Sequence, residues 1–328
     1  MPKATIIGNT TWGNTLGALL SKKGITVKLW ARSEAEAQGV NRKAHNYHST
    51  SDIAEAVDGA NLVIWATPSQ SLRRNVNQLK EHLSDSMLLL SAAKGLEVDS
   101  CKTMSQVMEE ELAPALRRQI CVLSGPNLAR EIAQGLPAAS VVAAREVAIA
   151  ETARDLMNCP DFFVLASDDI IGVELGGALK NIIALGAGMV DGLGLGDNAK
   201  AAFISWTWSE AASLGITLGA RADTFYGLAG LGDLMATCAS NLSRNHYVGY
   251  ELAQGRSLAE ISASMTQVAE GITTTLATHQ LAEKLGLKLP FTRLIYQVLF
   301  ENLPPKEAHF NFNKLVGIHG QALLEIPR

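Results

Sequence analysis

Short β-type runs alternate with helical stretches over the first half of the chain, and this alternation constrains the fold more than any other feature. From residue 170 onward the sequence continues in long helical stretches without a convincing strand. At 328 residues the chain is also too long for one ordinary core. Strands that alternate with helices predict βαβ units and a parallel sheet. The predicted strands are 4–8, 26–30, 61–66, 87–92, 120–125, 139–144 and 162–166. We therefore expect an α/β domain at 1–167 and an all-α domain at 168–328.

The segment IIGNTTWGNTLG follows the first predicted strand and opens the first predicted helix. This is the context of a dinucleotide-binding G-x-G-x-x-G loop, with Gly8 as the first glycine and Gly13 as the third. Thr10 occupies the middle position, where its Cβ should hold the pyrophosphate slightly away from the backbone. The alternative interpretation of the whole segment is an ordinary strand-to-helix turn that binds no dinucleotide. Arg32 stands where an acidic residue would bind the ribose 2′-hydroxyl of NAD, so its cation favours a 2′-phosphate. The sequence thus predicts a Rossmann-type, doubly wound sheet that binds NADP or NAD, with NADPH favoured, unless Arg32 is a solvated loop residue.

Three further loops should reach the edge of the sheet where ligands bind, beyond the carboxyl ends of the strands, and the first of them is WATPSQSLR (65–73) after the third predicted strand. Lys94 directly follows the predicted strand 87–92, and the segment SGPNLA (124–129) follows the next strand. Most lysines are surface residues, but few occupy a strand's carboxyl end in such a crevice. The SGPNLA segment also offers backbone amides at the start of a helix, which suits contact with an anion or a cofactor.

Lys180 interrupts the apolar stretch ELGGALKNIIALGAG (174–188). On a helix it stands over Gly176, Gly177 and Ala184, small residues that leave room for another surface or a ligand. Desolvation would lower the pKa of a buried, unpartnered lysine toward values useful for proton transfer. We predict that Lys180 is catalytic; the alternative is a side chain that extends to the surface.

The segment 227–246 contains a second group of polar residues. Asp233 and Thr237 are four residues apart and share a helical face, so Asp233 could hold a lysine and Thr237 could bind a substrate oxygen. A turn with a guanidinium between a hydroxyl and an amide suits phosphate binding, although an exposed helix cap would look the same. The residues of this turn are Ser243, Arg244 and Asn245.

Composition excludes several other classes of protein. The net charge of −4 provides no general attraction to nucleic acid or anionic membranes. No apolar run reaches the roughly 18 residues that span a bilayer, and the N-terminus lacks the features of a secretory signal. The four cysteines are scattered without a CxxC motif, and the seven histidines show no metal-ligand spacing. We expect a cytoplasmic protein without a metal, a nucleic-acid partner or an integral membrane segment, in which the glycine-rich stretch 191–197 is an interhelical loop.

Several longer motifs resemble those of bacterial NAD(P)-dependent glycerol-3-phosphate dehydrogenases, in the same order and across nearly the whole chain. The central motif, VELGGALKNIIALGAGMVDGLGLGDNAKAA, is highly specific to that family. The segment between Arg32 and SDIAEAV is shorter than usual there and lacks the typical proline, and Thr10 replaces the usual glycine. The matching motifs are KGLE (94–97), LSGPNLAREIAQGLP (123–137), the central motif (173–202), GLAGLGDLMATC (227–238), LSRN (242–245) and VAEGI (268–272).

The resemblance implies reversible reduction of dihydroxyacetone phosphate, a small phosphorylated substrate, to sn-glycerol 3-phosphate for phospholipid synthesis. Lys180 would donate the proton in reduction, Lys94 would contact substrate and cofactor, and a homodimer is expected because such enzymes are commonly dimeric. The resemblance implies a substrate site of Lys94, Gly125, Asn127, Lys180, Asp233, Ser243, Arg244 and Asn245, to which the sequence adds Thr237. The cofactor would contact Thr11, Trp12, Arg32, Lys94, Ala129, Arg244, Val268 and Glu270, besides Gly8 and Gly13 of the glycine loop.

Two alternative functions stay open at this point. A two-domain hydroxy-acid dehydrogenase would need a receptor for a carboxylate in place of the phosphate receptor. A catalytically impaired, nucleotide-binding sensor is supported by Thr10, but the intact set of Lys94, Lys180, Asp233 and Arg244 argues against it.

Overall fold

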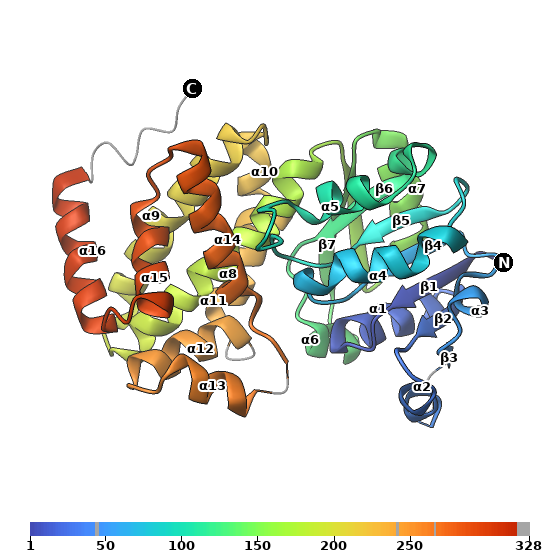
Figure 1. Ribbon diagram of the computed structural model, residues 1–328, viewed down its shortest axis with the longest axis horizontal. Helices are drawn as coiled ribbons and strands as arrows, with labels where there is room; N and C mark the ends of the chain where they lie inside the picture. Colours follow the sequence, from blue (N-terminus) through green and yellow to red (C-terminus); the bar gives the residue numbers. More distant parts are fainter. Residues whose placement is uncertain (43–45, 241–242, 266, 320–328) are drawn as a thin grey trace. The chain divides into compact units, whose positions relative to one another are not determined.

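The computed structural model describes residues 1–42, 46–240, 243–265 and 267–319 (Figure 1). Its contacts divide the chain into two units. The sheet unit contains residues 1–94 and 103–174, and the helical unit contains residues 95–102 and 175–328.

The described residues of the sheet unit form eight strands, and the predicted α/β class of this half is confirmed. Its strands are β1 (Lys3–Ile7), β2 (Thr26–Trp30), β3 (His48–Thr50), β4 (Leu62–Trp65), β5 (Leu88–Ser91), β6 (Ile120–Ser124), β7 (Ala138–Ala144) and β8 (Phe162–Ser167). Its α-helices are α1 (Thr11–Lys22), α2 (Glu34–Asn41), α3 (Ile53–Val57), α4 (Leu72–Leu79), α5 (Met104–Glu111), α6 (Ala129–Ala133) and α7 (Val147–Met157). Three short 3₁₀ turns are η1 (Ser69–Ser71), η2 (Lys80–His82) and η3 (Pro114–Gln119).

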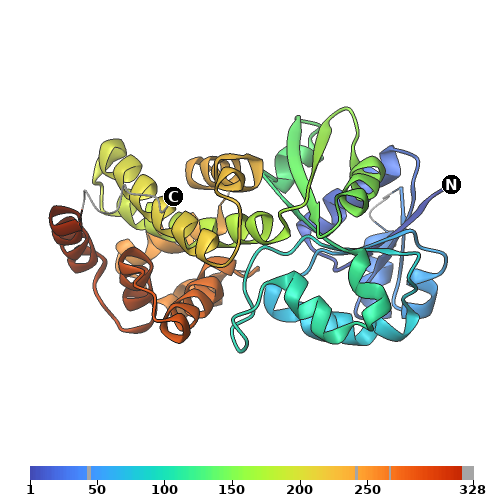
Figure 2. The same cartoon turned by 90° about the horizontal axis from the view of Figure 1, so that it is seen from above.

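The strand order is β3-β2-β1-β4-β5-β6-β7-β8, whose first six positions give the doubly wound order of dinucleotide-binding sheets. The order reverses between β1 and β4, so ligands are expected near the carboxyl ends of these two strands. Apolar side chains cover the strands on both faces, and Ile6, Ile64 and Leu90 have no exposed surface. Figure 2 shows α4 and α5 on one face of the sheet and α1 and α7 on the other.

The prediction of a wholly parallel sheet is wrong at one pair, because β7 runs antiparallel to β6. A parallel crossover must carry the chain back along the full length of a strand. The connection at 125–137 contains only the five-residue helix α6, which is about 8 Å long at 1.5 Å per residue, whereas five strand residues span about 16 Å. The helix alone does not return the chain along the strand, and β7 starts at the edge of the sheet where β6 ends. The elements β3, α3 and α7 were not predicted from the sequence.

The helical unit has no strand among its described residues, which confirms the all-α class of the second half. Its first helix, α8, begins in the sheet unit and continues into the helical unit. The helices are α8 (Ile170–Gly192), α9 (Gly196–Thr217), α10 (Ala222–Tyr226), α11 (Asp233–Ala239), α12 (Arg244–Ala253), α13 (Leu258–Ser264), α14 (Glu270–Leu285), α15 (Pro290–Phe300) and α16 (Pro305–His319), with a π-helical turn, η4 (Leu228–Gly232), before α11.

Helix α8 is the core of the helical unit. It is long and apolar enough to cross a bilayer by composition, but 94% of its most apolar 18-residue window is buried inside the protein, as in the core helix of a globular protein. Glycines let α12 approach it closely: a Cβ on Gly249 would lie 1.8 Å from the Leu185 carbonyl oxygen, and one on Gly188 would lie 2.0 Å from that of His246. The predicted interhelical loop is confirmed as the short turn between Gly192 and Gly196.

Candidate active site

The glycine loop after β1 lies at the point where the strand order reverses. Gly8 has φ +115°, and a Cβ there would lie 2.7 Å from Thr67 Cγ2 in the loop after β4. A Cβ on Gly13 would lie 2.4 Å from the Gly8 carbonyl oxygen, so both positions need glycine. Thr10 caps α1: its Oγ1 accepts the Gly13 N–H at 2.9 Å and donates to the Ala66 carbonyl at 2.7 Å. The hydroxyl therefore ties the loop to β4 and occupies an amide that a pyrophosphate would otherwise bind.

Residues that follow β5 and β6 meet at the same edge of the sheet. Lys94 is half-buried, and its Nζ donates to the Gly125 carbonyl at 2.7 Å. Gly125 has φ +145°, and a Cβ there would lie 2.8 Å from the Cα of Ser140. Asn127 Oδ1 accepts the Ser140 hydroxyl at 2.6 Å. The structure thus brings together Lys94, Gly125 and Asn127, which were predicted from separate segments.

Four buried polar atoms near this edge have no hydrogen-bond partner in the described part of the chain. They are Trp65 Nε1, Thr67 Oγ1, Ser124 Oγ and Asn127 Nδ2, at or just after the carboxyl ends of β4 and β6. Buried polar groups are normally satisfied, so these exceptions at the edge where ligands are expected call for an explanation. Together with the tight glycine loop, these atoms fit a bound dinucleotide.

The other cofactor residues predicted in the sheet unit lie around α1. Thr11 and Trp12 form its first turn, and the Trp12 ring meets Phe162 edge-on with centroids 6.3 Å apart. Thr15 Oγ1 donates to the Ala129 carbonyl at 3.3 Å, which places Ala129 against the same helix. Arg32 follows β2 as predicted, but its guanidinium pairs with a carboxylate of α2 that sequence reasoning did not identify.

Lys180 is buried in the helical unit, as the apolar context of its sequence predicts. It is 6% exposed, and its ammonium group forms a short ion pair with Asp233, which is 1% exposed. Lys180 Nζ also donates to Thr237 Oγ1 at 2.6 Å, and that hydroxyl donates to the Asp233 carbonyl at 2.7 Å. Asp233 and Thr237 share one face of α11, as their spacing predicts, and this face holds the lysine.

The small residues beside Lys180 serve helix packing. A Cβ on Gly176 would lie 2.7 Å from the Ala229 carbonyl oxygen in the π-helical turn η4. The sequence left open whether this face receives a ligand or another part of the protein. At Gly176 the structure shows contact with another part of the protein, the turn η4. The same turn leads directly into Asp233 and so fixes where the carboxylate meets the lysine. Irregular π-type turns often occur beside functional residues.

A chain of amide hydrogen bonds joins α8, α12 and α14. Asn245 Nδ2 donates to Asn181 Oδ1 at 2.9 Å, and Asn245 Oδ1 accepts the Gly271 N–H at 2.9 Å. Asn181 Nδ2 donates to the Gly177 carbonyl at 3.4 Å. Asn245 thus fixes the start of α14, an arrangement that the sequence did not reveal.

Arg244, Val268 and Glu270 lie together, since Arg244 Nη1 donates to the Val268 carbonyl at 2.6 Å. Arg244 is an exposed residue, but partial desolvation of its guanidinium lowers its pKa, and the charge of Glu270 opposes that shift. Ser243 caps α12 by accepting the His246 N–H at 3.2 Å. Leu242, the first residue of the LSRN motif, lies outside the described residues.

Asp191, near the C-terminal end of α8, contacts a lysine and a histidine. Its Oδ2 lies 2.6 Å from Lys200 Nζ and 2.6 Å from His246 Nε2. Burial alone would raise the pKa of Asp191, but the hydrogen bonds from Lys200 and His246 lower it. His246 of this cluster directly follows Arg244 and Asn245 in the sequence, and the histidine spacing gave no sign of the cluster. Across the described ranges, no group of three or more His, Cys, Asp or Glu side chains is placed to hold a metal ion.

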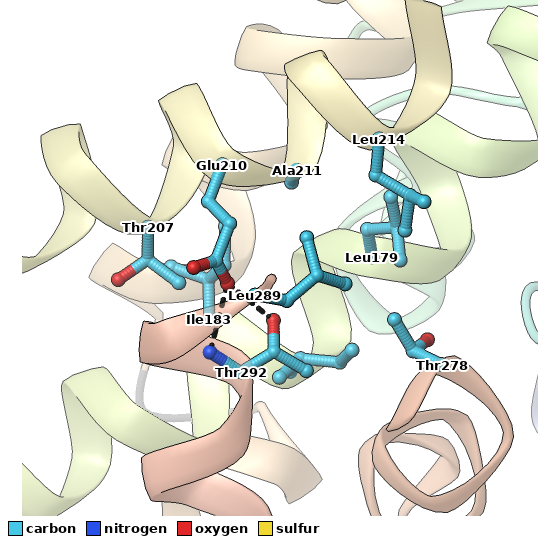
Figure 3. A pocket seen from close by; sticks show the side chains of 10 residues that line it. Leu179, Ile183, Thr207, Glu210, Ala211, Leu214, Thr278, Leu289 and Thr292 are labelled. Atoms are coloured by element: carbon cyan, nitrogen blue, oxygen red, sulfur yellow. Dashed lines mark hydrogen bonds between the residues drawn. The ribbon is translucent and has the colours of Figure 1, made fainter. Parts of the chain in front are cut away.

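A small cavity in the helical unit is separate from these residues (Figure 3). Its volume is about 10 Å³, enough for about one water molecule and too small for a substrate. Glu210 on its wall accepts N–H groups of Phe291 and Thr292 at 2.9 and 2.8 Å, and so caps α15. Burial raises the pKa of Glu210 to about 7, although these hydrogen bonds favour the charged form. Thr278 Oγ1, also on the wall, has no hydrogen-bond partner among the described residues.

Comparison with known proteins gives matches along most of the chain. Residues 3–150 match the family model described as NAD-dependent glycerol-3-phosphate dehydrogenase N-terminus, and residues 169–309 match the model of the corresponding C-terminus. A glycerol-3-phosphate dehydrogenase (NAD(P)+) from Dehalococcoides mccartyi strain CBDB1 is 51% identical over 321 residues, which cover 94% of this chain and 89% of that relative. A relative of the same name from Syntrophotalea carbinolica is 44% identical over 315 residues, 92% of this chain and 95% of that one. The crystal structure of a Coxiella burnetii glycerol-3-phosphate dehydrogenase aligns with a TM-score of 0.88 at 31% identity, covering 95% of this chain and 98% of that chain.

Proposed function

Because this chain belongs to the NAD-dependent glycerol-3-phosphate dehydrogenase family, we propose that it reversibly reduces dihydroxyacetone phosphate to sn-glycerol 3-phosphate. Family membership makes it an NAD(P)-dependent oxidoreductase. The proposal includes the direction of the reaction in the cell: reduction in the cytoplasm that supplies glycerophospholipid synthesis. It also includes a homodimer as the working form.

The observation that carries the proposal is the buried Lys180, which is held by Asp233 and Thr237. Reduction of a ketone adds a hydride to the carbonyl carbon and a proton to its oxygen. A bound nicotinamide dinucleotide supplies the hydride. The Lys180 ammonium donates the proton and stabilises the negative charge that develops on the oxygen, and solvent later returns a proton to the amine. A positioned acid of this kind contributes roughly 10²–10⁴-fold to the rate.

The supporting residues of the helical unit have separate tasks. Asp233 keeps the ammonium in place and balances its charge, while Thr237 accepts one of its hydrogen bonds. Arg244 and Ser243, at the start of α12, bind the substrate phosphate, because a guanidinium and a helix N-terminus both favour anions. Asn245 positions the start of α14 through Gly271, besides its implied place in the substrate site.

The sheet unit binds the cofactor. Gly8, Gly13 and the first turn of α1 hold the pyrophosphate. Lys94 and Asn127 contact the substrate, and Gly125 keeps their two loops close together.

The test is the change in cofactor absorbance when dihydroxyacetone phosphate is added with NADH and, separately, with NADPH. We expect oxidation of the cofactor that depends on this substrate and on Lys180. A parallel panel of 2-keto and 3-keto acids tests the hydroxy-acid dehydrogenase alternative, which predicts turnover of a keto acid instead. A sensor without catalysis would bind the dinucleotide and turn over none of these substrates.

A further inference from the structure

The loops after β1 and β2 lie side by side, because these strands are parallel neighbours in which Ile7 pairs with Trp30. In sheets of this kind the ribose of the adenosine half is bound at the carboxyl end of β2, by an acidic residue about 20 residues beyond the glycine loop. Arg32 occupies that place in the sequence. An arginine there, taken alone, favours the 2′-phosphate of NADP.

A carboxylate nevertheless reaches this place from α2. Glu36 Oε1 accepts the Asn9 side-chain amide at 3.2 Å, and Glu36 Oε2 accepts the backbone N–H of Arg32 at 3.2 Å. One acidic side chain thus bridges the glycine loop and the loop after β2. Ser33 fixes the helix that carries it, because its hydroxyl caps α2 by accepting the Glu36 N–H at 3.3 Å.

The same carboxylate neutralises Arg32. Arg32 Nε lies 3.5 Å from Glu36 Oε2, with the arginine side chain 73% exposed and the glutamate side chain 23% exposed. The carboxylate is therefore held by the protein, while part of its surface stays open to a ligand. A 2′-phosphate carries about −1.5 to −2 charges, so its approach would bring it against Glu36 and compete for Arg32. A ribose 2′-hydroxyl meets no such repulsion and can donate a hydrogen bond to the carboxylate.

We propose that Glu36 selects the cofactor: its carboxylate accepts the ribose 2′-hydroxyl of NAD(H) and repels the 2′-phosphate of NADP(H). This preference is opposite to the one predicted from Arg32 alone. The inference rests on the proposed function only in requiring a nicotinamide dinucleotide.

The test measures dissociation constants of the full chain for NADH and NADPH by fluorescence titration, without substrate. We expect the wild type to bind NADH about tenfold more tightly than NADPH. This is the ratio expected when NADPH cannot form the one charge-assisted hydrogen bond between the ribose 2′-hydroxyl and Glu36. In Glu36→Gln, NADH should bind about tenfold more weakly and NADPH about tenfold more tightly, since Arg32 is then available to the phosphate. The shift of the thermal unfolding midpoint by each dinucleotide should follow the same order.

Glu34→Gln is the matched control. Glu34 lies in the same first turn of α2 and carries the same charge, but its carboxylate accepts hydrogen bonds from Gln38 and Ser51, each at 3.1 Å. This variant should leave the NADH-to-NADPH ratio unchanged. An equal change of the ratio in both variants would show a general charge effect and overturn the inference, as would an unchanged ratio in Glu36→Gln.

The binding data also separate this inference from the proposed function. If the ratio changes as expected but dihydroxyacetone phosphate is not reduced, the proposed function fails and the role of Glu36 stands. If the substrate is reduced and the wild type prefers NADPH, the proposed function stands and the role of Glu36 fails.

Discussion

The buried pair of Lys180 and Asp233 gives a prediction in which stability and turnover separate. Lys180→Met removes the ammonium with little change in volume, and Asp233→Asn removes the carboxylate with almost none. Because the two residues are 6% and 1% exposed, each single change leaves the other charge buried without its counter-charge. Breaking such a pair costs about 3–5 kcal/mol of unfolding free energy. Each single variant should therefore be strongly destabilised relative to the wild type.

The double variant Lys180→Met/Asp233→Asn has no uncompensated charge. We expect it to lose only about 1–2 kcal/mol, which corresponds to the lost hydrogen bond from Lys180 to Thr237. Additive effects would instead total about 6–10 kcal/mol, comparable to the entire stability of a typical protein. Urea unfolding of the four proteins measures this coupling. Thr237→Val, which removes only the neutral partner, is the control.

Turnover should not follow stability in this series. Lys180→Met and the double variant both lack the proton donor, so the double variant should be folded and inactive while still binding the dinucleotide. A double variant as unstable as the sum of the single variants would refute the charge pairing. Turnover of Lys180→Met at nearly the wild-type rate would refute the assignment of the proton donor.

Three other changes test separate parts of the protein. Arg244→Ala should raise the KM for dihydroxyacetone phosphate about 10- to 100-fold with a smaller change in kcat, because a charged hydrogen bond to phosphate is lost; Arg256→Ala, an arginine paired with a glutamate elsewhere in the helical unit, should change neither constant. Thr10→Gly should tighten NADH binding in a titration, because it frees the Gly13 amide and removes a Cβ, while the lost helix cap lowers the unfolding midpoint slightly. Burial raises the pKa of Glu210 from its ordinary value of 4.5 to about 7. The unfolding free energy should therefore fall by about 3 kcal/mol as the pH rises from 4.5 to 7, because the unfolded state loses this proton first. Glu210→Gln should flatten the unfolding free energy over this pH range, and an unchanged slope would assign the titration to another group.

The sequence predicts the architecture well where a pattern repeats locally. Runs of mostly apolar residues identify seven of the eight strands among the described residues, and the central strands β4, β5 and β6 are buried along their whole length. The strand at 48–50 is too short to form such a run, and only its pairing with β2 identifies it as a strand. The direction of β7 depends on the path of the connection at 125–137, and the order of the predicted strands does not contain that path.

The same distinction applies to the candidate site. Asp233 and Thr237 are four residues apart on one helix, so their spacing alone predicts a shared face, and the apolar context of Lys180 predicts its burial. Glu36 is different, because its function depends on where its carboxylate reaches. It lies in the polar first turn of a helix, where an acidic residue is expected to stabilise the helix N-terminus and signals nothing more. Only the positions of Asn9 and Arg32 show that this carboxylate bridges the two neighbouring loops, which is the basis of its proposed role. The proposed role of Glu36 makes cofactor preference follow the combined charge of Arg32 and Glu36, and not the charge of Arg32 alone.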